Sequence, residues 1–411
     1  MTYLKATAAT VTMALMGGTA MAGCGIEQGS VRILANDFPA LRAVSDAAAE
    51  CAGDGVEVTS NHSADHKDIQ VSALTANPAQ YSVAVVANSS IIPLVNEGLI
   101  RPLDDLIAEH APDLPPTNKV TIDGKVMAIA FMANAQHLFV RDDILAEAGV
   151  ETPKTYDEVL AALEAIRAAG IMEYPFASNT GSGWNLAEEF VNMYLGHGGD
   201  FFVPGSAEPA INNEAGVQTL ETLKALAGYS DPDFLTFDSN ATQALWESGE
   251  AAIAYMWGSR GAGIIDAEGS TPEVVEATVL TAAPMVGDAG IPASSLWWDG
   301  FTIASHISDT DAEASFIAMM HGISEDVVAA NNDAAVWLSP AYQPGTSATG
   351  VAATVQSGAR PYPMEPYMGL MHGALGDELS AYLQGNESAE QALADVEAAY
   401  TAAAREQGFL K

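Results

Sequence analysis

The sequence predicts an α/β fold, in which strands and helices alternate along the chain. Runs rich in β-branched residues, such as 30–37 and 81–88, alternate with segments that have helical spacing of apolar residues. Several helix starts are marked by a Thr or Ser followed three residues later by Glu or Gln. With 411 residues, 49% of them hydrophobic and 17% charged, the chain is globular and long enough for two domains.

The N-terminal elements begin with a strand, "SVRILAND" (30–37), and a helix over about 39–51. A second short strand, "VEVTS" (56–60), follows. The segment "YSVAVVAN" (81–88) is almost wholly apolar, so we expect it near the centre of a parallel sheet.

Polar residues stand where two of these strands end. Asn36 and Asp37 close the first strand, and Asn88 and Ser89 follow the run at 81–88. In open α/β sheets, ligands bind at the carboxyl ends of strands. These four residues are therefore candidates for the rim of a binding site.

One predicted strand is unusually long. After the turn signal Asp123-Gly124, neither Gly nor Pro interrupts the segment 125–141. Its middle contains Asn134 and Gln136, which lie on the same face because strand side chains alternate. Two buried amides need hydrogen-bond partners, so we expect water or a ligand to contact this face of the strand.

The later helices begin at capping boxes. The three boxes are Thr155 with Glu158, Thr310 with Glu313, and Ser388 with Gln391. Two further strands are expected at 251–257 and 300–308.

The formal net charge is −38, from 15 basic and 53 acidic residues. This balance argues against nucleic acid and against an anionic membrane surface as partners. A solvated, salt-tolerant acidic surface is the favoured explanation, and a polycation-binding protein is the weaker alternative.

The first 22 residues resemble a signal peptide. Lys5 precedes a short apolar core at 6–16, and "AMA" (20–22) fits the rule for signal-peptide cleavage. The core is too short to span a membrane, and no later stretch holds 18 uninterrupted apolar residues. We expect cleavage near Ala22 and a soluble periplasmic protein.

The chain has two cysteines, Cys24 and Cys51. An even count in an oxidising compartment favours a disulfide between them. Lipidation of Cys24, which follows "MAG", remains the alternative. Neither cysteine has a His or Cys cluster around it, so a metal site is not expected there.

Enzyme motifs are absent from the sequence: there is no G-x-S-x-G, no P-loop and no G-x-G-x-x-G after a strand. "HSADH" (62–66) resembles a metallopeptidase box, but it directly follows a short strand and is predicted to be a loop. "GSRGAG" (258–263) lacks the Lys-Ser/Thr that a phosphate cradle needs. We therefore expect no catalytic residues, no metal and no cofactor.

What remains is a set of aromatic residues at the ends of elements. Trp184 follows "TGSG", Trp257 closes the strand before Gly258, and Trp298 and Asp299 precede the strand at 300–308. Flat, half-apolar rings suit sugars, and carboxylates and amides accept the sugar hydroxyls.

The alternative is that each Trp packs in the core. That explanation is favoured for Trp246, in mid-helix, and for Trp337. Ligand contact is favoured for Trp257, and the two explanations are balanced for Trp184 and Trp298.

Five stretches in the right order make the chain resemble the extracellular solute-binding proteins of ABC transporters, in the group that includes the maltose-binding type. The resemblance covers nearly the whole mature chain, and its most specific stretch is "IDGKVMAIAFMANAQHLFVRDDILAEAGVETPKTYDEVLAALEAI". The other four are "VNEGLIRPLDDLI", "ALWESGEAAIAYMWGS", "GFTIASHISDTDAEASFIAMM" and "NESAEQALADVEAAYTAA".

The resemblance implies a two-lobed periplasmic-binding-protein fold of the class II type, each lobe a mixed sheet flanked by helices, with the ligand cleft between the lobes. The long strand would then cross from one lobe to the other. The implied division is residues 23–133 and 300–342 in the first lobe, and 134–299 and 343–411 in the second.

The resemblance also implies function: a monomer without catalytic activity that binds a mono- or oligosaccharide, closes by hinge motion and delivers its ligand to the permease subunits of an ABC transporter. The ligand-binding residues that we expect on this basis, together with the strand-end argument, are Asn36, Asp37, Asn88, Ser89, Asn134, Gln136, Trp184, Trp257, Gly258, Trp298, Asp299 and Arg360.

The chain departs from the pattern at residues 88–90, "NSS", where many sugar binders carry an acidic residue. An anionic sugar derivative is therefore an alternative ligand, with Arg360, Arg260 and His372 as the residues to meet it. A cationic solute such as a polyamine is a further alternative, encouraged by the net charge. For Arg360, a surface ion pair is the competing explanation.

Overall fold

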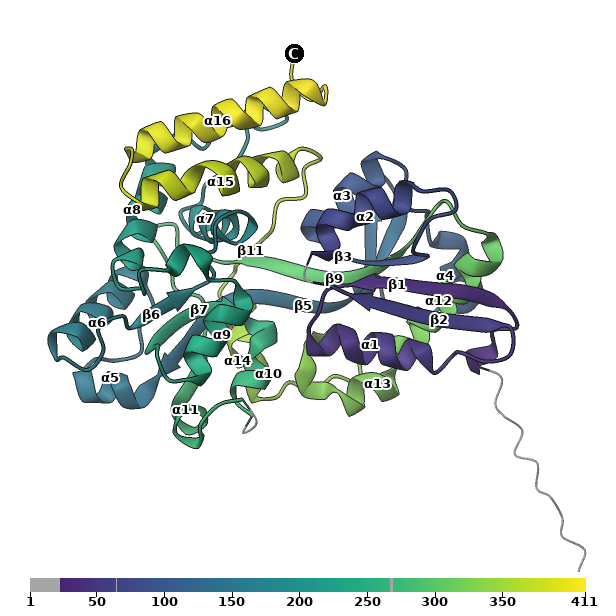
Figure 1. The fold of residues 1–411 in the computed structure, drawn as a ribbon, viewed down its shortest axis with the longest axis horizontal. Coiled ribbons are helices and arrows are strands. Elements are labelled where there is room, and N and C mark those ends of the chain that lie inside the picture. The colour runs from purple at the N-terminus through teal and green to yellow at the C-terminus, as the bar shows by residue number, and fades with distance from the viewer. Residues whose placement is uncertain (1–22, 64, 267–268) are drawn as a thin grey trace, which may run out of the picture.

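A computed structural model describes residues 23–63, 65–266 and 269–411, so the predicted signal peptide (1–22) lies outside the described residues. The chain forms two α/β lobes joined by two long strands that run from one to the other (Figure 1). Within the described part of the chain, no helix has the length and apolar character needed to cross a membrane.

Eleven strands are described. They are β1 (Gly29–Ala35), β2 (Val56–His62), β3 (Val83–Ala87), β4 (Lys119–Ile122), β5 (Lys125–Arg141), β6 (Phe176–Ser178), β7 (Ile253–Trp257), β8 (Thr278–Thr281), β9 (Ser295–Ile303), β10 (Val336–Trp337) and β11 (Arg360–Pro361).

We call the lobe built on β1–β4 the first lobe. Its helices are α1 (Pro39–Ala49), α2 (His66–Thr75), α3 (Asn88–Asn96), α4 (Asp104–His110), α12 (Asp309–Gly322) and α13 (Glu325–Ala330).

The second lobe is built on β6–β8. Its helices are α5 (Asp142–Ala148), α6 (Tyr156–Ala168), α7 (Trp184–Gly196), α8 (Glu214–Ala227), α9 (Ser239–Glu247), α10 (Gly261–Ile264), α11 (Pro272–Ala277), α14 (Thr349–Gln356), α15 (Met368–Leu383) and α16 (Ala389–Glu406). Short 3₁₀ turns lie at Gly23–Gly25, Pro116–Asn118, Phe234–Thr236, Gly258–Arg260, Asn332–Ala334 and Thr346–Ala348.

The strand order is β2-β1-β3-β9-β5-β7-β6. β1 pairs in parallel with β2 and β3, whereas β9 pairs antiparallel with β3 and β5. The predicted long strand is confirmed as β5, 17 residues in length. Its first part pairs with β4 and β9, and its last part, from Gln136, pairs with β7 and β8. β5 therefore belongs to the sheets of both lobes.

Three local predictions differ from the structure. The strand expected at 300–308 begins earlier, at Ser295, because Trp297 and Trp298 pair with β5 and Asp299 with β3. "HSADH" is not a loop throughout, since His62 ends β2 and His66 begins α2. α12 is capped by Ser308, whose hydroxyl accepts from the Asp311 N–H, rather than by Thr310. The boxes at Thr155 and Ser388 are N-caps as predicted.

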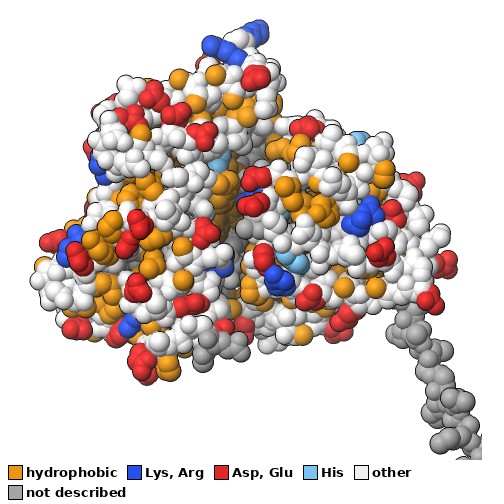
Figure 2. Space-filling view, viewed as in Figure 1, with side chains coloured by type: hydrophobic (Ala, Val, Ile, Leu, Met, Phe, Trp, Pro, Cys, Tyr) orange, Lys and Arg blue, Asp and Glu red, His pale blue; other side chains and the backbone are white. Residues whose placement is uncertain are grey.

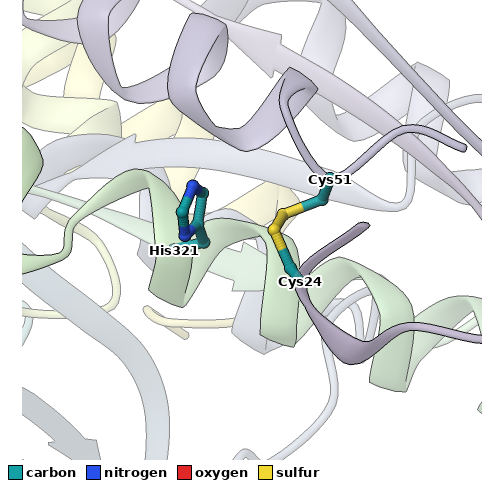
Figure 3. Close-up of side chains that lie close together, drawn as sticks. All are labelled: Cys24, Cys51 and His321. Carbon is teal, nitrogen blue, oxygen red and sulfur yellow. A yellow bond between two sulfur atoms is a disulfide. The ribbon is translucent and has the colours of Figure 1, made fainter. Parts of the chain in front are cut away.

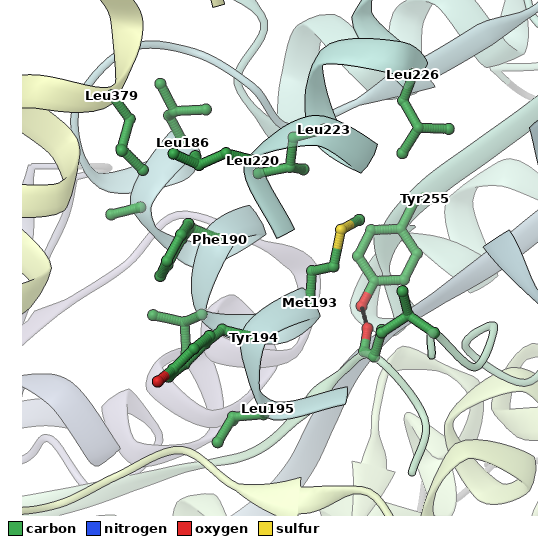
Figure 4. Packing of buried hydrophobic residues seen from close by; sticks show 14 of the residues in the cluster. Leu186, Phe190, Met193, Tyr194, Leu195, Leu220, Leu223, Leu226, Tyr255 and Leu379 are labelled. Atoms are coloured by element: carbon green, nitrogen blue, oxygen red, sulfur yellow. Dashed lines mark hydrogen bonds between the residues drawn. The ribbon is translucent and has the colours of Figure 1, made fainter. Parts of the chain in front are cut away.

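The core of the second lobe is built around α7. Its residues from Leu186 to Gly196 are all buried, including Phe190 and Tyr194, whose rings stack 5.5 Å apart. Leu220 and Leu223 of α8 and Leu379 of α15 pack around this helix (Figure 4). A helix buried all round is a rigid support. It begins at Trp184, so its first residue is held firmly at the edge of the lobe.

A disulfide joins Cys24 to Cys51, at the start of the described chain and just after α1 (Figure 3). His321 of α12 lies beside it. Because the two sulfurs are bonded to each other, neither is a thiolate ligand, and this trio is a structural tie rather than a metal site.

Candidate functional site

The surface is hollowed between the two lobes, with hydrophobic side chains along the hollow and charged ones at its mouth (Figure 2). A cavity of about 350 Å³ lies there, which we call the first cavity. The first lobe contributes Asn36, Phe38 and Lys67, the second lobe contributes Trp184, Trp257 and Arg260, and the crossing strands contribute Asn134, Trp297 and Asp299.

Three tryptophans form one wall of the first cavity. The Trp184 ring lies 5.6 Å from that of Trp297 and 6.4 Å from that of Trp257, and Trp257 and Trp297 meet edge to face at 5.6 Å. Trp297 is buried, while the other two remain half-exposed. This wall offers flat apolar surface to a ligand.

The wall is fixed from behind by hydrogen bonds. His372 donates through Nε2 to the Trp184 carbonyl, 3.0 Å away, and accepts at Nδ1 from the Tyr362 hydroxyl, also at 3.0 Å. Burial lowers the pKa of His372 to about 3, so this imidazole is neutral. Its ring also stacks on Trp184, 4.9 Å between centroids.

Behind Trp297 lies the buried carboxyl group of Glu188. The Trp297 indole N–H donates to Oε1 of Glu188 at 2.9 Å, and the Ser295 hydroxyl donates to the same oxygen at 2.7 Å. Burial raises the pKa of Glu188 to about 8 despite these hydrogen bonds. Burial also raises the pKa of the neighbouring Glu189 well above its usual range, and the pKa of about 8 keeps Glu188 mostly protonated at neutral pH.

Lys67 reaches across the cleft from α2. Its Nζ lies 4.0 Å from the centroid of the Trp184 ring and 5.4 Å from that of Trp297. Burial lowers the pKa of this ammonium, and the charge of Asp299 opposes the shift. The contact is a cation–π interaction between the two lobes.

Asp299 supplies a carboxylate to the cavity. Burial raises its pKa to about 6, and the Lys67 charge works against that rise. A carboxylate and an ammonium in one cavity provide both acceptors and donors for ligand hydroxyls.

The two amides of β5 have different surroundings. Asn134 lines the first cavity, where its Nδ2 donates to the Ser259 hydroxyl at 3.2 Å and its Oδ1 accepts from the Ser259 N–H. Gln136 is 1% exposed and lies outside the cavity. Its amide lies close enough to Glu189 to lower that carboxyl's pKa, but makes no well-formed hydrogen bond within the described residues.

Of the four strand-end residues predicted to form the rim of the site, only one lines the first cavity. Asn36 lines the first cavity. Asp37 does not, and is paired with Arg42 at 2.6 Å. Asn88 is buried and bonds the β9 backbone, donating to the Leu296 carbonyl and accepting from the Trp298 N–H. Ser89 lines a separate cavity, described below.

Three further predicted residues lie away from the first cavity. Trp298 points to the opposite face of β9 from Trp297 and Asp299 and packs against the first-lobe core, as strand alternation requires. Gly258 sits under Val351, with no room for a side chain. Arg360 bonds Asp200 and the Gly199 carbonyl, both at 2.9 Å, in another cavity. Trp246 and Trp337 are buried, as favoured from the sequence.

The ligand-site predictions omitted several cavity residues. Lys67 directly follows "HSADH" (62–66), predicted from the sequence to be a loop, and Phe38 is the N-cap residue of α1, with no side-chain capping hydrogen bond. Trp297 adjoins Trp298 in sequence, so only the register of β9 shows which ring faces the cleft. Arg260, which we expected only for an anionic ligand, also lines the first cavity.

The family model for bacterial extracellular solute-binding proteins matches residues 35–321. A probable ABC transporter-binding protein of Deinococcus radiodurans is 25% identical over 226 residues, which cover 53% of this chain and 52% of that protein. The chain thus spans about half the length of the curated relatives it matches.

Solved structures share the fold. An ABC transporter solute-binding protein of Agrobacterium radiobacter K84, in complex with ribitol, superposes with a TM-score of 0.78 at 21% identity, covering 90% of this chain and 97% of that one. Another from Agrobacterium vitis S4, with bound D-mannitol, gives 0.77 at 18% identity, with 92% and 99% covered. These likenesses confirm the predicted two-lobed architecture. Since the family model spans more than half of the sequence, the chain belongs to the bacterial extracellular solute-binding proteins.

Proposed function

We propose that this protein is the substrate-binding component of an ABC importer and that it captures a carbohydrate or polyol in the first cavity. The observation that carries the proposal is the wall of Trp184, Trp257 and Trp297 between the lobes. A sugar ring has apolar C–H faces that stack on indole, and hydroxyls at its edge that need polar partners.

The polar partners stand opposite and beside that wall. Asp299 and Asn36 can accept from ligand hydroxyls, while Lys67 and Arg260 can donate to them. The two structurally similar proteins hold ribitol and D-mannitol, ligands of the same hydroxyl-rich chemistry.

The mode of action follows from the connections between the lobes. β5 and β9 run through both, so bending within these strands would open and close the cleft. We infer lobe boundaries near residues 133 and 299 for the same reason. The protein would act as a periplasmic monomer, exported by the segment 1–22, and would hand its ligand to the permease without chemical change.

Two alternative ligand classes have unequal support. An anionic sugar derivative loses two of its expected partners, because Arg360 lies in another cavity and His372 is a buried neutral group, and keeps Arg260. A cationic solute is favoured by one specific observation: the tryptophan wall already accommodates the Lys67 ammonium.

Thermal-shift screening with polyols, mono- and oligosaccharides, sugar acids and polyamines tests the proposal. A true ligand at about 100 times its Kd should stabilise the folded protein by about 2.7 kcal/mol. Stabilisation by polyamines alone would replace the carbohydrate proposal with the cationic one.

A further inference from the structure

A second cavity adjoins the first. It has a volume of about 250 Å³ and lies between α2 and α3 of the first lobe and α15 of the second. The two cavities share two lining residues, Lys67 and Trp184, which are also in contact with each other. The Lys67–Trp184 contact therefore separates the two cavities.

One side of this partition is fixed. Trp184 begins the buried helix α7, its carbonyl accepts from His372, and its ring stacks on the His372 imidazole. Moving the indole would break its stacking on His372, and the backbone that carries it is fixed by α7 and by the hydrogen bond to its carbonyl.

The other side is free to move. Across the described parts of the chain, Lys67 makes no hydrogen bond and no ion pair within 4.0 Å, and its ammonium lies over Trp184 in the cation–π contact. Lysine has a flexible four-carbon stem with three rotatable donors at its end. Burial lowers the pKa of this ammonium, which means that its position over the ring costs hydration.

The second cavity has the lining of a ligand subsite. Gly369 and Gly373 on α15 present bare backbone, with open space where a side chain would be. Gln70, 1% exposed, and Ser89 line the same cavity, and Oε1 of Gln70 and Oγ of Ser89 have no partner among the described residues. A bare surface with unpartnered oxygens suits a hydroxyl-bearing ring.

The volumes of the two cavities also favour a ligand that occupies both. Ligand pockets span roughly 300–1,000 Å³. The second cavity falls below this range and the first lies at its lower end, but both together fall well within it.

We propose that the second cavity is a subsite for a further sugar unit, and that an oligosaccharide enters it by displacing the Lys67 ammonium from the face of Trp184. A single sugar or polyol fills the first cavity with Lys67 in place. A longer ligand takes over the Trp184 face and reaches Gln70. This inference rests on the proposed function and specifies the ligand as an oligosaccharide.

The test is titration calorimetry with glucose, mannose and galactose and with their two- to four-unit oligomers. Gly373→Leu places a side chain in the second cavity, at a position where a Cβ would have no other atom within 4 Å. It should lower the affinity for oligomers relative to that for single units by at least about tenfold. Gln384→Leu, at the exposed end of the same helix and outside the cavity, is the matched control and should leave this ratio unchanged.

Lys67→Ala removes the partition and should raise the affinity for oligomers relative to that for single units about 3- to 30-fold, the range expected for loss of a cation–π contact. Circular dichroism and melting curves show that each variant is folded. The inference is overturned if Gly373→Leu affects both ligand sizes equally or neither, or if no oligomer binds better than its single unit in any variant. If wild type and variants bind no carbohydrate at all, the proposed function fails as well.

Discussion

The indole N–H of Trp297 donates to the buried carboxyl group of Glu188, 2.9 Å away, so one wall of the cleft is held by a group that is neutral at pH 7. The raised pKa makes the folded state bind a proton that the unfolded chain loses. Between the ordinary pKa of 4.5 and the folded value of about 8, stability should therefore fall as the pH rises.

We predict that the fall in the free energy of unfolding between pH 7 and pH 8 is about 1 kcal/mol smaller in Glu188→Gln than in wild type, because the contribution of Glu189, whose pKa is also raised, is common to both. The amide keeps an oxygen for Trp297 but does not titrate. His137 and His372 do not contribute to the fall in stability between pH 7 and pH 8, because their lowered pKa values affect stability only below about pH 6.5. Urea unfolding at several pH values measures it.

The matched control is Glu151→Gln, an exposed carboxyl on the surface, which should leave the wild-type slope intact. An equal slope in wild type and Glu188→Gln would show that Glu188 is not the group that titrates.

Trp257 and Trp298 allow a comparison of two tryptophan variants, because the first ring lines the first cavity and the second does not. Trp257→Ala should weaken ligand binding about 10- to 100-fold, because a half-exposed ring of the first cavity is lost. Trp298→Ala should leave binding within about twofold and lower the melting temperature, since that ring packs against the first-lobe core. Calorimetry with a ligand found by screening decides between them. The reverse ranking would mean that β9 presents its other face to the cleft.

The raised pKa of Asp299 predicts that ligand affinity depends on pH. Its pKa of about 6 means that the carboxylate, the better hydroxyl acceptor, forms as the pH rises through 6. Affinity should rise about tenfold from pH 5 to pH 7 and then level off, and Asp299→Asn should abolish the rise. Asp37→Asn, outside the cavity, should retain it. A pH-independent wild-type affinity would remove Asp299 from ligand contact.

The sequence predicted local structure better than contacts across the cleft. The extent of β5 and two of three helix caps follow from signals within a few residues, such as the absence of Gly and Pro over 125–141. The early start of β9 depends on pairing with strands more than 150 residues away, which no local pattern encodes.

The same distinction applies to the site. The topology of the fold explains why four predicted residues lie at the cleft. Two stand at the ends of elements, Trp184 at the start of α7 and Trp257 at the end of β7, and two lie in the middle of the crossing strands, Asn134 in β5 and Asp299 in β9. In the sequence, Glu188 cannot be told apart from a carboxylate on the exposed face of a helix. Only the packing of α7 shows that it is buried. The role of Lys67 depends on a ring from the other lobe.

The disulfide provides the last prediction. Cys24 and Cys51 are 27 residues apart, and closing a loop of that length should stabilise the protein by about 3–4 kcal/mol through the unfolded chain. Cys24→Ser with Cys51→Ser should lower the free energy of unfolding by about that amount. Ligand affinity should stay unchanged, because the bridge lies beside α12 and lines neither cavity of the cleft (Figure 3). Reduced wild type serves as the chemical counterpart of the double variant. A loss of affinity in either, with the fold intact, would mean that the N-terminal tie also sets the position of the first lobe's cleft residues.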